Sequence, residues 1–296
     1  MPQGPSPSYH EIFDADKGHH LFFEGNSILV HAMSVGAHLA TSQKRGFAQA
    51  SLNYLEGISE RPATRRAAPR FLERSDFPDI HKPSFFKFVD DEALAHLKRG
   101  SLRLGTPSYY RTTEDDGRAD HLEGYATVFL EGEQKSFNLT ATSGFNCAVF
   151  CGVAARPTNF RRLEKMREKF GTHLIQIIDP TTFGALICEQ LGGIRYHIRD
   201  VQYADAKYMS IDTDDLDDFL RTFGTGDLTK ETIHEINTRY WHAFYEHLLL
   251  PSVFSKSKKF SSENERRMLF ELSTNITTPF LTVEVADVAR HIRFHD

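Results

Sequence analysis

The chain has 296 residues, of which 40% are hydrophobic and 25% are charged. This size and composition suit a globular protein with one large or two modest cores, and exclude the fibrous and disordered classes. The formal net charge of −5 argues against duplex nucleic-acid binding through overall charge, so a small-molecule partner is the better expectation. The apolar runs are shorter than the roughly 18–20 residues that a membrane-spanning helix needs.

The cysteines and the first residues predict the compartment. Three cysteines, Cys147, Cys151 and Cys188, are too few and too unevenly placed for a disulfide framework. The opening residues show no signal-peptide pattern. We therefore expect a cytoplasmic protein that is not anchored in a membrane.

The first eighty residues differ in pattern from the rest. Residues 1–9 are rich in proline and serine and predict a tail. Apolar residues in 28–39 and 47–55 recur at helical spacing, which predicts one or two helices. The basic, proline-bearing stretch 61–70 is typical of a connection. We divide the chain into a tail with a helical extension, residues 1–80, and a main domain, residues 81–296.

The main domain opens with a strand, a helix and a strand. The helix of residues 90–99 has acids in its first turn, bases in its last and Gly100 after it. A polar loop follows over residues 109–124, and loops of this kind often carry function. Further strands are predicted at 125–130, 136–142, 145–153, 173–178 and 194–203, and helices at 159–170, 182–190, from 212 and over 227–250. The alternation is irregular, so we expect an α+β fold.

Familiar site signatures are missing from the sequence. There is no Gly-x-Gly-x-x-Gly and no phosphate-binding Gly-x-x-x-x-Gly-Lys-Ser/Thr. His242 and His247 are five residues apart, whereas an inverted zinc-protease motif needs four. Cys147 and Cys151 share one face of a predicted strand, where small hydrophobic residues pack. These residues predict no metal site.

The most informative stretch runs from Phe260 to Leu272. Read as a strand, it places Glu263, Glu265 and Arg267 on one face, with like-facing Cα atoms roughly 6.5–7 Å apart, and apolar residues on the other. Read as a helix, it has a capping box and an i,i+4 ion pair, and its two carboxylates point apart. Both readings stay open from the residues alone.

On a strand, the two carboxylates could divide a reaction between them. Each raises the pKa of the other, while Arg267 opposes that rise. One can stay ionised and face a developing positive charge while the other takes a proton from the attacking group. The alternative is a strand whose polar side faces water.

A resemblance bears on this choice. The run Phe260-x-x-Glu263-x-Glu265-x-Arg267 resembles the closing signature of a bacterial family of uncharacterised domains. Matches to the same family continue in the strand at 85–88, in 93–108, in 170–175 and in 201–203, so the resemblance covers roughly residues 81–275. That family is similar to the ADP-ribosyltransferase fold, a split mixed sheet that grips NAD in a cleft.

The resemblance implies roles for particular residues. Glu265 would hold the nicotinamide-ribose hydroxyl and favour the oxocarbenium-like cation, and Glu263 would position or deprotonate the acceptor. Residues expected at NAD are Lys87 or Arg103 at the pyrophosphate, Tyr109 or Tyr110 on the nicotinamide, and Ser143 beneath it. Where the family has a short acidic turn, this chain has Arg118-x-Asp120-x-x-Glu123-Gly124, which leaves the acceptor open.

The expected function is therefore an NAD-consuming ADP-ribosyltransferase or NAD glycohydrolase, such as a bacterial toxin or anti-phage effector. NAD is the substrate, and the acceptor is a protein or a nucleic acid. One alternative is a catalytically silent module that binds a nucleotide or a partner. Another is a metal-dependent hydrolase with oxygen ligands from Asp120, Glu123, Glu263 and Glu265.

Overall fold

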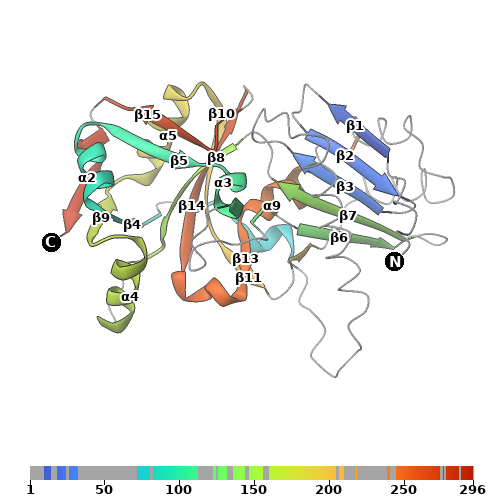
Figure 1. Cartoon of the computed structure of the whole chain (residues 1–296), viewed down its shortest axis with the longest axis horizontal. Helices are drawn as coiled ribbons and strands as arrows, with labels where there is room; N and C mark the ends of the chain where they lie inside the picture. The colour runs from blue at the N-terminus through green and yellow to red at the C-terminus, as the bar shows by residue number, and fades with distance from the viewer. Residues whose placement is uncertain are drawn as a thin grey trace, which may run out of the picture.

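The structure, a computed structural model, places its strands in two larger sheets that lie side by side (Figure 1). It describes residues 10–14, 19–24, 27–32, 72–80, 83–112, 123–124, 126–131, 136–143, 147–155, 160–204, 207–209, 218, 239–240, 245–273, 276, 278–286 and 288–295. Both helices and strands contribute to the same core, so the chain combines α and β structure around a mostly antiparallel sheet. No helix in the described ranges is both long and apolar enough to cross a membrane.

The strands are β1 (His10–Asp14), β2 (His19–Glu24), β3 (Ser27–Ala32), β4 (Phe85–Val89), β5 (Ser101–Gly105), β6 (Ala126–Glu131), β7 (Ser136–Ser143), β8 (Cys147–Val153), β9 (His173–Ile177), β10 (Gly193–Asp200), β11 (Gln202–Ala204), β12 (Tyr208–Met209), β13 (Ser255–Ser257), β14 (Glu265–Leu272), β15 (Phe280–Glu284) and β16 (Ile292–His295). The helices are η1 (Arg74–Asp76), α2 (Asp91–Lys98), α3 (Pro107–Thr112), α4 (Phe160–Phe170), α5 (Pro180–Gln190), η2 (Tyr245–Leu249), α9 (Leu250–Val253), η3 (Lys258–Glu263) and η4 (Val288–His291).

The eight-stranded sheet forks at β8. Its path runs β10-β14-β8-β4-β9-β16, and β5, which pairs with β15, also pairs with β8. One edge of β8 pairs with β14 along its length. On the other edge β4 meets β8 at Val153, whereas β5 meets it at Val149. Neither contact covers Cys151, so the sheet is split at this point.

Helices cover both faces of this sheet, because strands such as β4 carry apolar residues on both faces. Phe85 and Val89 of β4 belong to the large core with Phe183 of α5. Phe86 and Phe88, which point the other way, pack with Met166 of α4. The strand is therefore apolar on both faces, as its continuous aromatic sequence predicts. The predicted positions of α2, α4, α5, β8 and β9 are confirmed to within two residues.

The six-stranded sheet corrects the expected N-terminal helices. Its order is β1-β2-β3-β7-β6-β12, and Ser27–Ala32, which include Ile28 and Leu29 of the predicted helix, form a strand. Residues 28–30 are three consecutive apolar residues, a run that fits a buried strand as well as a helix. Spacing alone does not distinguish the strand from the helix. The other predicted helical positions, residues 33–58, lie outside the described residues.

This sheet also joins segments from both sides of residue 81. Strand β3 pairs with β7 in parallel, from Ser27 opposite Asn138 to His31 opposite Ser143. Strand β12 pairs with β6, so the sheet holds strands from residue 10 to residue 209. The hydrogen bonds of the sheet therefore cross the boundary that composition suggested.

Two further predicted segments are shorter or differently folded than expected. The polar loop begins with a helix, α3, instead of irregular chain. The C-terminal end of the predicted helix over 227–250 is a π-helical turn, η2, which leads into α9 with Pro251 near its start. Residues 113–122 and most of 210–244 lie outside the described ranges.

Candidate functional site

A cavity of about 550 Å³ opens where the sheet forks. Its walls come from β4, α2, β5, α3, β8, α4, β13, η3, β14 and β15, together with Glu123. The expected site residues among its lining are Lys87, Arg103, Tyr109, Tyr110, Glu263 and Glu265. Residues far apart in the sequence, from Lys87 to Thr282, therefore converge on one cavity.

The coordinates decide between the strand and the helix for residues 265–272. They form β14, in register with β8 and β10, with Met268, Phe270 and Leu272 in the core. Glu265 and Arg267 share the opposite face, where the Arg267 Nε donates to Glu265 Oε1 over 2.7 Å. The helical capping box is therefore wrong.

Glu263 does not lie on that strand, which corrects the expected spacing. It is the last residue of the 3₁₀ helix η3, and Asn264 after it has a left-handed conformation with φ of 50°. This turn replaces the strand repeat that would have set Glu263 beside Glu265. The two carboxylates nevertheless converge, because both contact Lys256.

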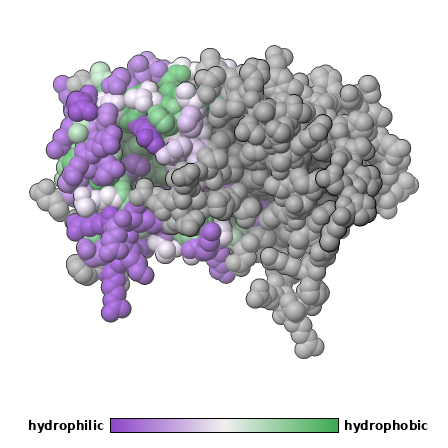
Figure 2. Space-filling view, in the orientation of Figure 1, coloured by the Kyte–Doolittle hydropathy of each residue, from purple (hydrophilic) through white to green (hydrophobic). Residues whose placement is uncertain are grey.

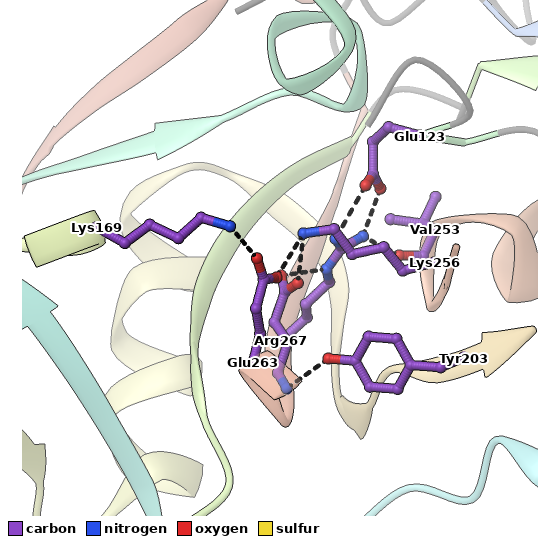
Figure 3. A network of polar contacts seen from close by, with 8 residues as sticks. Glu123, Lys169, Tyr203, Val253, Lys256, Glu263 and Arg267 are labelled. Carbon is purple, nitrogen blue, oxygen red and sulfur yellow. Dashed lines mark hydrogen bonds and ion pairs between the residues drawn. The ribbon is translucent and has the colours of Figure 1, made fainter. Parts of the chain in front are cut away.

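Six charged side chains of alternating sign form a continuous chain of ion pairs, which Figure 3 shows from close by. The members, in order, are Lys169, Glu263, Lys256, Glu265, Arg267 and Glu123. Lys169 Nζ lies 2.7 Å from Glu263 Oε1, and Lys256 Nζ lies 2.8 Å from Glu263 Oε2 and 3.2 Å from Glu265 Oε2. We call these residues the charge ladder.

The ladder runs from a partly exposed end to a buried one. The Lys169 side chain is 27% exposed, whereas the Arg267 and Glu123 side chains are 2% and 1% exposed. Arg267 donates to both Glu123 oxygens and to the Val253 carbonyl (Figure 3). Buried charges are stable only when paired and hydrogen-bonded, and alternation of sign meets that condition.

Backbone bonds fix the start of β14 at the cavity. The Glu265 N–H donates to the Tyr203 hydroxyl over 2.8 Å (Figure 3). The Glu265 carbonyl accepts from the Val201 N–H, and the Asn264 carbonyl accepts from the Ala154 N–H. These three contacts come from different segments of the chain. They hold in place the backbone that carries the Glu265 side chain.

The electrostatics keep Glu265 ionised. Burial opposes its charge, but the neighbouring Arg267 and Lys256 outweigh burial and hold the pKa of Glu265 well below its usual range. Burial also opposes the charge of Lys256, yet Glu265 and Glu263 raise the pKa of Lys256 above its ordinary value. Glu265 is thus an anion at neutral pH.

Cys151 lines the cavity on the same side of the sheet as Glu265. It lies opposite Arg267 in the β8–β14 pairing and is only partly buried. Burial first, and then the Glu265 charge, raise the pKa of the Cys151 thiol to about 12. The thiol is therefore uncharged at neutral pH and lines the cavity as a small hydrophobic side chain, as expected from the sequence.

Lys87 and Arg103, the residues expected at a pyrophosphate, both line the cavity but differ in surroundings. Lys87 Nζ donates over 2.8 Å to the Cys151 carbonyl, which lies on the edge of β8 between the contacts with β4 and β5. Burial lowers the pKa of Lys87. Arg103 is exposed and lies over the Phe280 ring at 4.2 Å and the Tyr109 ring at 5.3 Å. Among the described residues no carboxylate pairs with Arg103.

The two tyrosines come from the first turn and centre of α3. Tyr109 accepts a hydrogen bond from Arg103 over 2.6 Å, and its ring meets Tyr110 edge-on at 5.5 Å. Tyr110 packs on Gly105, where a Cβ atom would approach its ring to 2.6 Å. Burial raises the pKa of Tyr110. Ser143 ends β7 in the six-stranded sheet, and its side chain lies outside the described part of the structure.

Three ladder members had no signal that singled them out. Lys256 is one of three lysines in a short stretch, Lys169 is one of several bases on α4, and Glu123 is predicted only as a possible oxygen ligand within the stretch that replaces the family's acidic turn. Hydrophilic side chains cover α4 at the lower left of Figure 2, so composition does not separate Lys169 from its neighbours. Lys169 and Glu123 are distinguished by partners 94 and 144 residues away in the sequence, and Lys256 by carboxylates 7 and 9 residues away. Sequence spacing alone predicts none of these pairs.

Comparisons with protein-family models, with curated proteins and with solved structures find no match to this chain. In the part of the chain that the structure describes, no group of three histidine, cysteine or carboxylate side chains is placed to hold a metal ion. Asp120, one of the four ligands of the metal-dependent alternative, lies outside that part. The function therefore has to be argued from the cavity itself.

Proposed function

We propose that the protein is an NAD-consuming ADP-ribosyltransferase or NAD glycohydrolase, with the split sheet serving as an ADP-ribosyltransferase-like scaffold. The observation that carries the proposal is Glu265, a buried and ionised carboxylate held rigidly at the wall of a cavity in the fork of the sheet. The forked β8 and the closing Phe260-x-x-Glu263-x-Glu265-x-Arg267 run agree with the resemblance seen in the sequence.

The chemistry of NAD cleavage calls for such a group. As nicotinamide leaves, positive charge develops on the ribose ring, and a fixed negative charge lowers the energy of that transition state. A carboxylate with a depressed pKa suits this electrostatic role better than proton transfer, because it holds a proton poorly. Glu265 would therefore stabilise the ribosyl cation and accept a hydrogen bond from a ribose hydroxyl.

The remaining lining fits a dinucleotide in size and character. The cavity volume falls within the range of small-molecule sites, which mix apolar walls with a few polar groups. Arg103 lies over the Tyr109 and Phe280 rings and donates to the Tyr109 hydroxyl, so its other N–H groups could bind a phosphate while the two rings offer an aromatic surface to a base. The three unbridged cysteines agree with a cytoplasmic setting, where NAD is present.

The proposal is tested by nicotinamide release from NAD. Wild-type protein should release nicotinamide, and Glu265→Gln should lower the rate by about 10²- to 10³-fold, the usual loss when one charge-stabilising group is removed. The variant should still fold, because Lys256 retains its ion pair with Glu263 and Arg267 retains its ion pair with Glu123. Glu284→Gln, an exposed change on β15, is the matched control and should retain full activity.

The same contacts support a second candidate, a catalytically silent module that binds NAD or another nucleotide. Lys256 already occupies one oxygen of Glu265 and one of Glu263, which leaves fewer acceptors for a substrate. This candidate predicts NAD binding by calorimetry without nicotinamide release, and binding that Glu265→Gln leaves unchanged. Nicotinamide release that depends on Glu265 would exclude it.

A further inference from the structure

Lys256 is the central member of the charge ladder. It lies in β13, and its side chain is only 9% exposed. The ammonium contacts Glu263 and Glu265 at once and lies 4.5 Å from the centre of the Phe260 ring. The motif has four members, Phe260, Glu263, Glu265 and Arg267. Lys256 therefore contacts three of the four.

Both carboxylate oxygens of Glu263 already accept a hydrogen bond from a lysine. Its Oε1 accepts from Lys169 and its Oε2 accepts from Lys256, over 2.7 and 2.8 Å. A general base must reach the proton that it removes, and both Glu263 oxygens already accept from a lysine ammonium group. The proton-accepting role that the family resemblance implies for Glu263 therefore conflicts with its surroundings.

The distances indicate what Glu263 does instead. Lys256 lies 0.4 Å closer to Glu263 than to Glu265, at 2.8 against 3.2 Å. Glu263 thus draws the ammonium away from Glu265, and Arg267 holds the other Glu265 oxygen from the opposite side. When Lys256 moves toward Glu263, the Glu265 Oε2 atom could accept a hydrogen bond from a ribose hydroxyl.

We propose that Lys256 is a positioning residue of this site: it holds the Glu265 carboxylate for the substrate, and Glu263 acts through Lys256 instead of on the acceptor. This inference rests on the proposed function, because the substrate is the ribose of NAD. It assigns a role to a residue that the motif does not contain.

Other charged and titratable groups surround this lysine and must be counted with it. Lys169 of α4 and Arg267 of β14 are the other cations in contact with the pair of carboxylates. Lys87 of β4, Cys151 of β8, Tyr203 of β11 and Glu123 also act on Glu265 or Lys256 through their charge or hydrogen bonds. Lys256 is the one among them that contacts both carboxylates.

The test is a double-mutant cycle between positions 256 and 263, read by nicotinamide release across pH. Lys256→Met leaves two neighbouring carboxyl groups with less positive charge, so the acid limb of kcat/KM should move up by about 1–3 pH units. Glu263→Gln should lower activity in the wild-type background and raise it in the Lys256→Met background, because it removes the repulsion. Lys256→Arg, which keeps the charge, should restore the wild-type pH profile.

Lys259→Met is the matched control. The Lys259 ammonium lies 4.6 Å from the centre of the same Phe260 ring, but its side chain is exposed and no carboxylate in the described ranges pairs with it. This variant should keep the wild-type pH profile. If Glu263→Gln lowers activity by the same factor with and without Lys256, Glu263 acts independently and the proposal is wrong.

Two measures keep the test decisive. If Lys256→Met does not fold, the Lys256→Met, Glu263→Gln double variant loses one charge of each sign, and it should fold and keep activity within about tenfold of wild type. If the wild type releases no nicotinamide, the proposed function fails, yet the charge coupling is still measurable. Carbon-13 NMR of labelled glutamate should then show a carboxyl that titrates about 1–3 units higher in Lys256→Met. An unchanged titration would overturn the role of Lys256.

Discussion

At the scale of single residues, the molecule stabilises buried charge by alternating its sign. The charge ladder is one example, and a second lies at the far end of β14, where Glu271 accepts from Arg195, His197 and Tyr245. Removing one member of a buried pair costs about 3–5 kcal/mol because the other is left uncompensated. Each ladder position is therefore constrained by its neighbours before any substrate is considered.

His197 gives a pH prediction at this scale. Burial opposes its charge, but hydrogen bonds to Asp79 and Glu271 raise the pKa of His197 above its ordinary value of 6.5. A raised folded-state pKa stabilises the fold below pH 6.5, and this contribution disappears as pH rises through the folded value. The free energy of unfolding should fall with a slope of up to about 1.4 kcal/mol per pH unit above pH 6.5. His197→Gln, measured by urea unfolding, should flatten that slope, and an equal slope in both proteins would contradict the assignment.

At the scale of elements, the η3–β14 junction places the carboxylates. A 3₁₀ helix ends at Glu263, the strand begins at Glu265, and Asn264 turns the chain between them in a left-handed conformation. Asparagine tolerates this conformation better than residues with a branched Cβ. The junction lets two acids that are two residues apart reach one ammonium from different directions.

Asn264 can therefore be tested by substitution. Asn264→Val should lower the free energy of unfolding by about 1–2 kcal/mol, because a β-branched residue is strained at positive φ. Asn264→Gly, which adopts the same φ without strain, should stay close to wild type. Urea unfolding of the three proteins measures the difference. Equal stability of the valine and glycine variants would show that the turn does not constrain the junction.

The elements also show how far sequence patterns predict this molecule. The residues alone left a strand and a helix open for this stretch. The strand interpretation gave the correct core face, Met268, Phe270 and Leu272, and put Glu265 and Arg267 together on the other face. The position of Glu263 was missed because a single left-handed residue breaks the period. The pairing of Glu123 with Arg267 was missed because it joins residues 144 apart in the sequence, and the contact of Lys256 with Glu265 was missed because it depends on η3, which lies between β13 and β14. The N-terminal strand β3 was missed because its apolar run fits two periods.

At the scale of the whole molecule, the two larger sheets share connections. Helix η2 contacts β6 and β7, and its Tyr245 donates to Glu271 of β14. Strands β1 to β3 extend the six-stranded sheet through the β3–β7 pairing. In Figure 1 this sheet lies beside the part of the molecule that holds the fork. We therefore expect the segments before and after residue 81 to depend on each other for stability.

A fragment of residues 81–296 tests that dependence. It lacks β3, so the edge of β7 loses its partner, and unpaired edges promote association between chains. It also lacks Asp79, the ion-pair partner of Arg199. Light scattering should show concentration-dependent self-association of the fragment but not of the full chain. A monomeric fragment with the unfolding midpoint of the full chain would contradict this account.

The most direct measurement of the central claim is a crystal structure of the Glu265→Gln variant with NAD. The variant should bind NAD without cleaving it, since the charge that stabilises the cation is gone while the cavity remains. The account predicts NAD in the fork of the sheet, with a hydroxyl of the nicotinamide ribose within hydrogen-bond distance of the side chain at position 265. An empty cavity at saturating NAD, or a nicotinamide ribose bound away from position 265, would contradict it.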